Sequence, residues 1–374
     1  LILLLAVCCA GCAGPNHLAG GETAVPVVCL VGVTRHRIYI ATPRAVSDNP
    51  SEFFSGRRSP QLSFAAVDVT VPPSHRKGKI ERPASLPPDP RRHFVIDTPE
   101  LFEDRSSFQR AVAAAARSQP RDEQEVLLFV HGYNTNLTSA LLQMAQFVED
   151  SGYKGVPIIF TWASSGHTAK YVYDINSALV ARDPLISMLG LMESADIRGY
   201  DLLAHSMGTF LVMEAGRQIS ITTGLNPTGK ARNVVLAAPD IDVDVFVSQI
   251  RRFPERYRRF VVLVSQDDKA LLASRRIAGG VARVGQVPAS ELAKLGVNAI
   301  DLSAVKDTGS LDHSKFKNSP EIAQMLGTAL SESSSFESDI DFSAGRAIGA
   351  GLDGALKAVG IGGDARCVDH QIAK

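Results

Sequence analysis

The chain has 374 residues, of which 45% are hydrophobic and 21% charged, a composition typical of a globular protein large enough to bury its own core. Its 39 acidic and 39 basic side chains give a formal net charge of zero, which excludes the basic excess typical of nucleic-acid-binding proteins. The cysteine and histidine spacings do not match a zinc site, so the sequence predicts no metal and no other cofactor.

The chain opens on an apolar run, residues 1–12, that ends in small residues and is too short to span a bilayer as a helix. We interpret it as the hydrophobic part of an export signal. The ending Ala10-Gly11-Cys12 resembles a bacterial lipobox, in which Cys12 becomes the lipidated first residue of the mature protein. This predicts a lipid-anchored protein of the bacterial cell envelope. The alternative is plain signal cleavage, which would release the protein to the periplasm or the medium.

Residues 13–24 are interpreted as a linker, and residues 25–122 as a mostly extended N-terminal region packed on the main sheet. Strands are indicated there by β-branched and aromatic residues, and the proline-rich stretch 83–90 is expected to be an irregular connection. The expected strands are 25–33, 37–42 and 62–71, and a helix is expected around 106–118. Cys29 and Cys367 are the cysteines left after Cys12, either paired or present as free buried thiols.

Between residues 123 and 330, buried strands alternate with helical patterns, which is typical of a parallel sheet covered by helices on both faces. The sequence therefore predicts an α/β class core. The expected strands are 126–130, 156–162, 201–204, 233–238, 260–265 and 299–302. The expected helices are 137–150, one or two within 170–195, 208–219, 242–252, 271–277 and 320–330.

Two further segments have a distinctive composition. The basic cluster at residues 251–259 either touches phosphates or lipid head groups or is a solvated helix end before the next strand. The Ser- and Gly-rich tail, residues 331–374, has apolar residues at helical spacing, and its charged residues argue against a membrane span. We expect it to form a short amphipathic helix or to be disordered.

One serine lies in a strand–turn–helix arrangement in the middle of the core. Residues 201–204 are a predicted strand and residues 208–219 a predicted helix, with Ser206 in the turn between them. Ala204 and Gly208 supply the small residues that let the helix double back against the strand. We interpret Ser206 as a nucleophile; the alternative is a serine that only caps the helix.

His131 and Gly132 directly follow the predicted strand 126–130. In hydrolases built on a parallel sheet, a loop at this position donates one backbone N–H to an oxyanion hole, and the residue after the nucleophile donates the second. We therefore expect the loop of Gly132 and Tyr133, together with Met207, to hold the oxyanion. The side chain of His131 is expected to form hydrogen bonds within the loop.

A serine hydroxyl needs a histidine to remove its proton, and that histidine needs an acid to orient it. Asp267 and Asp268 follow the predicted strand 260–265, and His313 follows the last predicted strand of the core. This order of serine, acid and histidine is the order that this class of hydrolase uses. Asp267 is the competing acid, but we expect Asp268 to orient His313 and Asp267 to cap the helix that follows.

Other candidates are given different roles. Asp240 ends an earlier strand and is an alternative acid or a helix cap. His205 adjoins the serine but points the wrong way for a base, and His167 is expected to be an exposed polar residue. The segment 164–199 either is a lid over the serine or, as we favour, simply covers the sheet. As a lid, it would line an acyl pocket with Tyr171, Tyr173, Leu185, Ile186, Met188 and Leu189.

With these residues in place, the chain resembles the α/β-hydrolase superfamily, and within it the lipase-like bacterial group known as domain of unknown function 900. The resemblance extends from about residue 39 to residue 330. It implies an α/β-hydrolase fold and a serine hydrolase with Ser206, Asp268 and His313 as its triad. The motifs that carry it are 40–44, 54–58, 62–64, 71–75, 129–136, 203–208, 237–242, 268–271 and His313.

The residues and the resemblance together predict a carboxylesterase or lipase-like serine hydrolase that forms a covalent acyl-enzyme. Its expected substrate is a small-molecule or lipid ester, its expected membrane contact is through the lipidated N-terminus, and no nucleic-acid partner is expected. Two alternatives stay open: a non-catalytic envelope scaffold with the same fold, and an amide or peptide hydrolase with the same triad. The sequence does not predict the oligomeric state.

Overall fold

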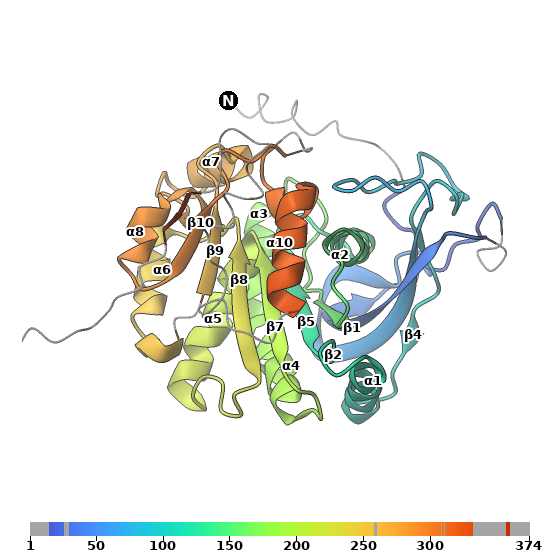
Figure 1. Ribbon diagram of the computed structural model, residues 1–374, viewed down its shortest axis with the longest axis horizontal. Helices are drawn as coiled ribbons and strands as arrows, with labels where there is room; N and C mark the ends of the chain where they lie inside the picture. Colours follow the sequence, from blue (N-terminus) through green and yellow to red (C-terminus); the bar gives the residue numbers. More distant parts are fainter. Residues whose placement is uncertain are drawn as a thin grey trace, which may run out of the picture.

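Figure 1 shows the computed structural model of the protein. It describes residues 15–25, 30–257, 260–307, 309, 311–331 and 357–359. The predictions for the signal segment 1–12, for Cys12, Cys29 and Cys367, and for most of the tail 331–374 lie outside the described residues.

A largely parallel sheet forms the centre of the molecule. In chain order, its strands are β1 (Thr34–Val46), β2 (Phe54–Val71), β3 (Val95–Ile96), β4 (Glu100–Leu101), β5 (Val126–Val130), β6 (Val156–Phe160), β7 (Tyr200–His205), β8 (Ala231–Ala237), β9 (Phe260–Val264), β10 (Asn298–Asp301) and β11 (Lys357–Val359). Across the sheet they lie in the order β11-β10-β9-β8-β7-β5-β6-β1-β2-β3, and β4 also pairs with β2. The pairings from β10 to β1 are parallel, and antiparallel pairings occur toward the two edges.

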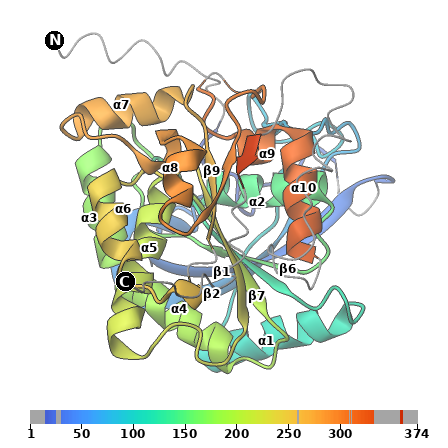
Figure 2. The same ribbon diagram turned by 60° about the vertical axis from the view of Figure 1, so that its left-hand side comes forward.

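Helices cover both faces of this sheet (Figure 1 and Figure 2). They are α1 (Arg105–Ser118), α2 (Leu137–Ser151), α3 (Tyr171–Val180), α4 (Arg182–Ser194), α5 (Met207–Thr222), α6 (Val243–Ile250), α7 (Lys269–Ile277), α8 (Ala289–Ala293), α9 (Lys315–Asn318) and α10 (Pro320–Ser331). The core on one face includes side chains of α2, α9 and α10, and the core on the other includes those of α1, α3, α4, α5 and α6.

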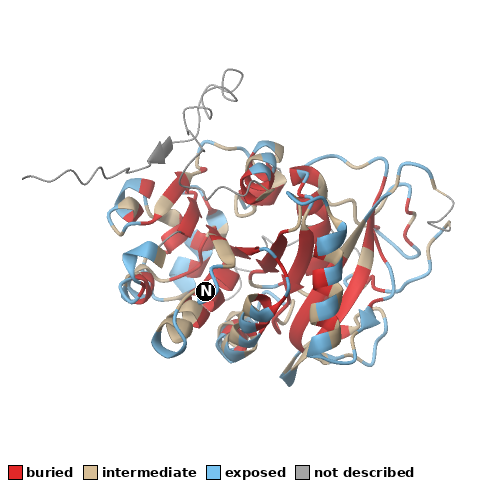
Figure 3. Ribbon diagram, turned by 60° about the horizontal axis from the view of Figure 1, so that its bottom comes forward, coloured by how far each residue is buried: buried red, intermediate tan, exposed pale blue. Residues whose placement is uncertain are grey.

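The strand β5 shows why the sequence indicates this arrangement. Val126, Leu128 and Val130 belong to one hydrophobic core, and Leu127 and Phe129 belong to the other. Because successive side chains of a strand point to opposite faces, a strand covered on both sides is apolar at every position. Figure 3 shows the strands as a buried layer between the helices. The predicted fold class, a mostly parallel sheet with helices on both faces, is confirmed.

The N-terminal region extends the sheet, whereas the sequence predicted that it packs on the sheet. β1 pairs with β6 in parallel, and β2 pairs with β1 in antiparallel, with register shifts around Arg44. β2 begins at Phe54, well before the predicted start at residue 62. Its first part contains Gly, Pro and two arginines, which hide the strand pattern. Residues 30–33, part of the predicted strand 25–33, contain a turn.

Several short elements were not predicted, among them β3, β4, α8 and α9. Residues 357–359 of the tail form β11 and pair with β10, where the sequence allowed a short helix. These segments are too short to show a periodic pattern, and their partners are distant in the chain. Within the part of the chain that the structure describes, no helix is long and apolar enough to cross a membrane.

Candidate active site

The candidate nucleophile lies on a sharp turn between β7 and α5. Ser206 has φ 53° and ψ −125°, a conformation that is strained for a residue with a side chain. Hydrogen bonds hold this turn: Ser206 N donates to Ala237 O at 3.0 Å, and Thr209 N donates to Ser206 O at 3.0 Å. A strained strand-to-helix turn is the device that presents a serine hydroxyl at the carboxyl edge of a parallel sheet.

The alternative role of Ser206 as a helix cap is not seen. Ser206 occupies the N-cap position of α5, but its side chain forms no cap hydrogen bond. In contrast, Asn136, Asp242 and Asp268 do accept cap hydrogen bonds at the starts of α2, α6 and α7. Capping therefore does not explain a serine at position 206.

Two glycines let the loop after β5 approach this turn closely. A Cβ atom on Gly132 would lie 2.7 Å from the Cβ of Ser206 and 3.1 Å from His205 O. A Cβ atom on Gly208 would collide with His131 O. The backbone of the predicted oxyanion loop therefore lies directly against the serine, and only glycine fits at these two positions.

The remaining predicted oxyanion residues lie beside this contact. Met207 is the first residue of α5, so its backbone N–H has no acceptor within the helix. Tyr133 belongs to the loop, and its hydroxyl donates to the carbonyl of Thr168. His167, predicted to be exposed, is exposed. The structure thus places Gly132 of the loop against Ser206, with Met207 as the next residue of the chain.

The predicted acid and base are in direct contact. His313 Nδ1 lies 2.7 Å from Oδ2 of the fully buried Asp268, whose Oδ1 accepts from Leu271 N at 2.9 Å. Burial disfavours charge on His313, but the carboxylate of Asp268, helped by Asp240, outweighs it and raises the pKa of His313 above its usual 6.5. With its Nδ1 proton directed at Asp268, His313 has Nε2 as its proton acceptor.

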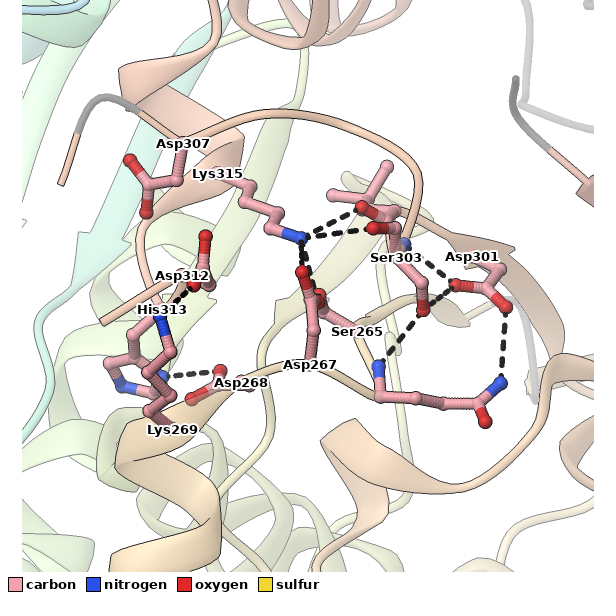
Figure 4. A network of polar contacts seen from close by, with 12 residues as sticks. Ser265, Asp267, Asp268, Lys269, Asp301, Ser303, Asp307, Asp312, His313 and Lys315 are labelled. Carbon is pink, nitrogen blue, oxygen red and sulfur yellow. Dashed lines mark hydrogen bonds and ion pairs between the residues drawn. The ribbon is translucent and has the colours of Figure 1, made fainter. Parts of the chain in front are cut away.

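Asp267, predicted to cap α7, instead holds a buried lysine (Figure 4). Lys315 Nζ lies 2.7 Å from each carboxylate oxygen of Asp267 and 3.1 Å from Leu302 O. Asp268 forms the cap because its side chain faces the first turn of α7. The Asp267–Lys315 ion pair ties the loop after β9 to α9, which follows His313.

His205 packs behind His313. Its Nε2 lies 3.0 Å from His313 O, and because a carbonyl only accepts, Nε2 carries the proton. The two imidazole rings lie 4.7 Å apart between centroids. Burial, followed by the charge of His313, lowers the pKa of His205 well below its usual value. His205 therefore stays neutral and supports the position of His313.

A buried arginine holds the oxyanion loop from beneath. Arg44 is 1% exposed; its Nη2 donates to Thr135 O at 2.6 Å and its Nη1 to Ser164 O at 3.0 Å. Burial lowers the pKa of Arg44 to about 10, so the guanidinium is charged at neutral pH. Sequence reasoning gave Arg44 no role, although it belongs to the motif 40–44 that contributed to the family resemblance.

His131 has the local role that the sequence predicts. It is fully buried, with Nδ1 2.9 Å from Gly132 O and Nε2 3.0 Å from Thr161 Oγ1. Its ring stacks on Trp162, with the centroids 5.2 Å apart. Burial and the nearby charge of Arg44 lower the pKa of His131 to about 3, so it is neutral. These contacts stiffen the loop.

Asp240, the alternative acid, has partners of its own. It accepts from Ser274 Oγ at 2.5 Å and from Tyr171 OH at 3.1 Å, and it lies 3.3 Å from Arg283 Nε. Asp242 provides the cap of α6. Asp240 is therefore neither the partner of His313 nor a helix cap. Among the described residues, no group of three or more His, Cys, Asp or Glu side chains is placed to hold a metal ion.

The segment 164–199 contains α3 and α4, and α4 covers the sheet. Leu185 and Met188 are fully buried in the core, so they do not line an acyl pocket. Ile186 and Leu189 line a cavity elsewhere in the molecule. The position of α4 agrees with the covering role that the sequence favoured, whereas α3 contacts the oxyanion loop: Tyr171 packs edge-on against Tyr133, with the ring centroids 5.3 Å apart.

The replacement Gly132→Ala is expected to lower kcat/KM for a nitrophenyl ester by roughly 100-fold, the effect of losing one oxyanion donor. The added methyl would press on Ser206 and His205, so the loop must move away from the serine. Gly21→Ala is a matched control, because its nearest neighbour would be Leu18 O at 3.9 Å. An unchanged kcat/KM in folded Gly132→Ala protein would contradict the role of this loop.

Comparison with protein families gives one match over most of the core. The family described as "Alpha/beta hydrolase of unknown function (DUF900)" matches residues 104–329, which include Gly132, Ser206, Asp268 and His313. A search of curated proteins finds no match to the chain.

Solved structures of hydrolases share a partial likeness with the chain. An esterase of Pyrobaculum calidifontis is 12% identical, with a TM-score of 0.33, over 61% of this chain and 92% of that chain. A dienelactone hydrolase from Anabaena variabilis is 8% identical, with a TM-score of 0.34, over 80% of this chain and 97% of that chain. The carboxylesterase CesB from Bacillus subtilis is 9% identical, with a TM-score of 0.28, over 56% of this chain and 84% of that chain.

Proposed function

The chain belongs to the α/β-hydrolase family DUF900, and from this membership we propose that it is a serine hydrolase that cleaves carboxylic esters. The observation that carries the proposal is the 2.7 Å contact between Asp268 and His313, whose ring lies 4.7 Å from that of His205, the residue before the serine of the strained turn. In this proposal Ser206 is the nucleophile, His313 the general base and Asp268 the residue that orients His313.

The proposed acylation step follows from the proton positions. His313 Nε2 takes the proton of Ser206 Oγ as the oxygen attacks the carbonyl carbon of the ester. The carboxylate of Asp268 stabilises the imidazolium that forms, in keeping with the raised pKa of His313. His313 then gives this proton to the departing alkoxide, which leaves as an alcohol. Water, activated by the same histidine, hydrolyses the acyl-enzyme and releases the carboxylic acid.

The oxyanion is proposed to rest on backbone N–H groups of Met207 and of the Gly132–Tyr133 loop. Arg44 and His131 hold this loop through contacts that bury both side chains completely or nearly so. A rigid loop keeps its donors in place before charge develops, which is where such donors act most strongly.

We also keep the proposal that the protein is exported and anchored through a lipid on Cys12. Its support is the apolar segment 1–12 and the lipobox-like ending Ala10-Gly11-Cys12. Anchoring would place the hydrolase beside lipid esters, so both lipids and small soluble esters belong to the proposed substrate class.

The wild-type protein is expected to hydrolyse short-chain nitrophenyl esters with a kcat/KM that rises with pH and is half-maximal above pH 6.5. Activity rises with pH because protonated His313 cannot accept the serine proton. The midpoint lies above pH 6.5 because the pKa of His313 is raised above that value. The measurement is a kcat/KM profile from pH 5 to pH 9, with a panel of acyl chain lengths to define the pocket. Folded protein that neither hydrolyses these esters nor reacts with a fluorophosphonate would favour a non-catalytic scaffold.

A further inference from the structure

A cavity lies at the opposite end of the sheet from Ser206. Its volume is about 760 Å³, and it lies between α4 and α5, over the beginnings of β7, β8 and β9. Tyr200, Ala231 and Phe260, the first residues of these strands, line it, whereas Ser206 follows the end of β7. At about 3.3 Å per residue, β7 separates the two places by roughly 20 Å. The cavity is therefore distinct from the proposed active site.

The wall of this cavity is largely apolar. Ile186 and Leu189 reach it from α4, and Val212, Met213 and Ile219 reach it from α5. Figure 1 and Figure 2 show these two helices side by side on one face of the sheet. Ile186 and Leu189 pack on the hydrophobic core but are only partly buried. A cavity of this size with an apolar wall is typical of a site that encloses an apolar ligand.

One arginine of the basic cluster noted in the sequence, Arg256, lines this cavity. It is exposed, with its guanidinium carbon 4.7 Å from the centre of the Tyr257 ring. Arg251 and Arg252 are exposed on the same segment, which has Glu255 as its acidic residue. In the described part of the chain, these three arginines form no ion pair. The charge of Arg256 is thus open to an anion.

Among the described residues that line the cavity, the one carboxylate is that of Glu193, and it already accepts hydrogen bonds within the protein. Glu193 accepts from Tyr200 OH at 2.8 Å and from Thr228 N at 3.2 Å. Lys230 Nζ adds positive charge beside it by donating to Glu193 O at 3.0 Å. Glu193 is therefore engaged within the wall. Arg232 also lines the cavity, but it is paired with Glu125 and Asp201, so Arg256 determines which charge a ligand would carry.

We propose that the cavity between α4 and α5 binds a free fatty acid, with its acyl chain along the apolar wall and its carboxylate at Arg256. Guanidinium and carboxylate groups form paired, charge-assisted hydrogen bonds. A small inorganic anion would leave the apolar wall uncovered, and a neutral lipid would leave Arg256 without a partner. A single chain with one negative end satisfies both parts of the cavity.

The test is calorimetric titration of the full chain with laurate, after treatment with a fluorophosphonate. If the proposed function holds, the fluorophosphonate blocks Ser206, so that laurate can bind only outside the active site. If the protein does not react with the fluorophosphonate, the titration still measures binding of laurate to the cavity. We expect one laurate to bind per chain. Arg256→Glu is expected to weaken its affinity about three- to tenfold. Arg92→Glu is the control and should leave the affinity unchanged, because Arg92 is exposed and lies far from the cavity residues in the sequence. Ile219→Trp, which fills the cavity, is expected to weaken binding at least about tenfold.

A neutral ligand of the same chain length separates the contribution of the carboxylate to binding from that of the hydrocarbon chain. We expect 1-dodecanol to bind more weakly than laurate to the wild type and equally to the wild type and Arg256→Glu. Laurate binding that disappears on fluorophosphonate treatment, or that both cavity variants retain in full, would overturn the proposal. Binding to vesicles of an anionic phospholipid without binding to monomeric laurate would also overturn it, because it would assign the arginines to a membrane surface.

Discussion

Replacement of Ser206 by alanine is expected to lower kcat/KM for a nitrophenyl ester by about 10,000-fold or more and to abolish covalent labelling by a fluorophosphonate. The reason is that the serine oxygen forms the acyl bond, and no other side chain in the proposed mechanism can replace it. The residual rate would come from the oxyanion donors and from substrate binding. Hydrolysis is measured with purified protein, and labelling is read on a denaturing gel.

The same variant separates catalysis from capping. A serine that caps a helix costs about 0.5–2 kcal/mol of stability when it is replaced by alanine. Because Ser206 makes no cap hydrogen bond to α5, we expect the free energy of unfolding of Ser206→Ala to equal that of the wild type. Ser248→Ala, at an exposed serine of α6, is the matched control and should label normally. Labelling of Ser206→Ala at the wild-type rate would refute the assignment of the nucleophile.

The central strands were predictable because both faces of the sheet are covered. β5 and β9 are buried at every residue, so each reads in the sequence as an unbroken apolar run. The first part of β2 shows the opposite case. There Arg58 reaches α3, where its Nε lies 2.8 Å from Ser177 Oγ. Contacts with a distant helix put a charged residue in a strand, and local sequence pattern does not show them.

The candidate site was predictable where topology alone brings its residues together. Ser206 and Asp268 each follow a parallel strand, β7 and β9, at its carboxyl end, and such ends meet at one edge of a sheet. From the sequence Asp268 was favoured over the adjacent Asp267 as the acid, and in the structure Asp268 contacts His313 Nδ1 at 2.7 Å. Asp267 was wrongly expected to cap α7, because a buried lysine from beyond His313 draws it away.

The contacts that hold the oxyanion loop could not be predicted from the sequence. Arg44 is bound by the carbonyls of Ser55 in β2 and of Thr135 and Ser164 in two separate loops. Backbone carbonyls exist at every residue, so a sequence gives no sign of which ones converge. The same holds for the cavity between α4 and α5, whose apolar wall has the residue pattern of an ordinary core.

Asp268→Asn is expected to lower kcat by roughly 1,000- to 10,000-fold while the fold is kept. Asparagine caps helices as well as aspartate does, so its oxygen can still accept from Leu271 N at the start of α7. Its amide nitrogen then faces His313 Nδ1 as a donor, which forces the histidine proton onto Nε2. His313 in this tautomer cannot accept the serine proton, and the stabilising charge of Asp268 is lost as well.

A pH profile and a neighbouring variant make this prediction specific. Without the Asp268 charge, the pKa of His313 is expected to fall, so the residual activity should persist to lower pH than in the wild type. Asp267→Asn is the matched control, because it weakens the ion pair with Lys315 but leaves Asp268 in place. We expect it to lower the free energy of unfolding, and to lower kcat far less than Asp268→Asn does. Equal losses of kcat in the two variants, or a residual activity of Asp268→Asn with the wild-type pH profile, would mean that Asp268 does not orient the base.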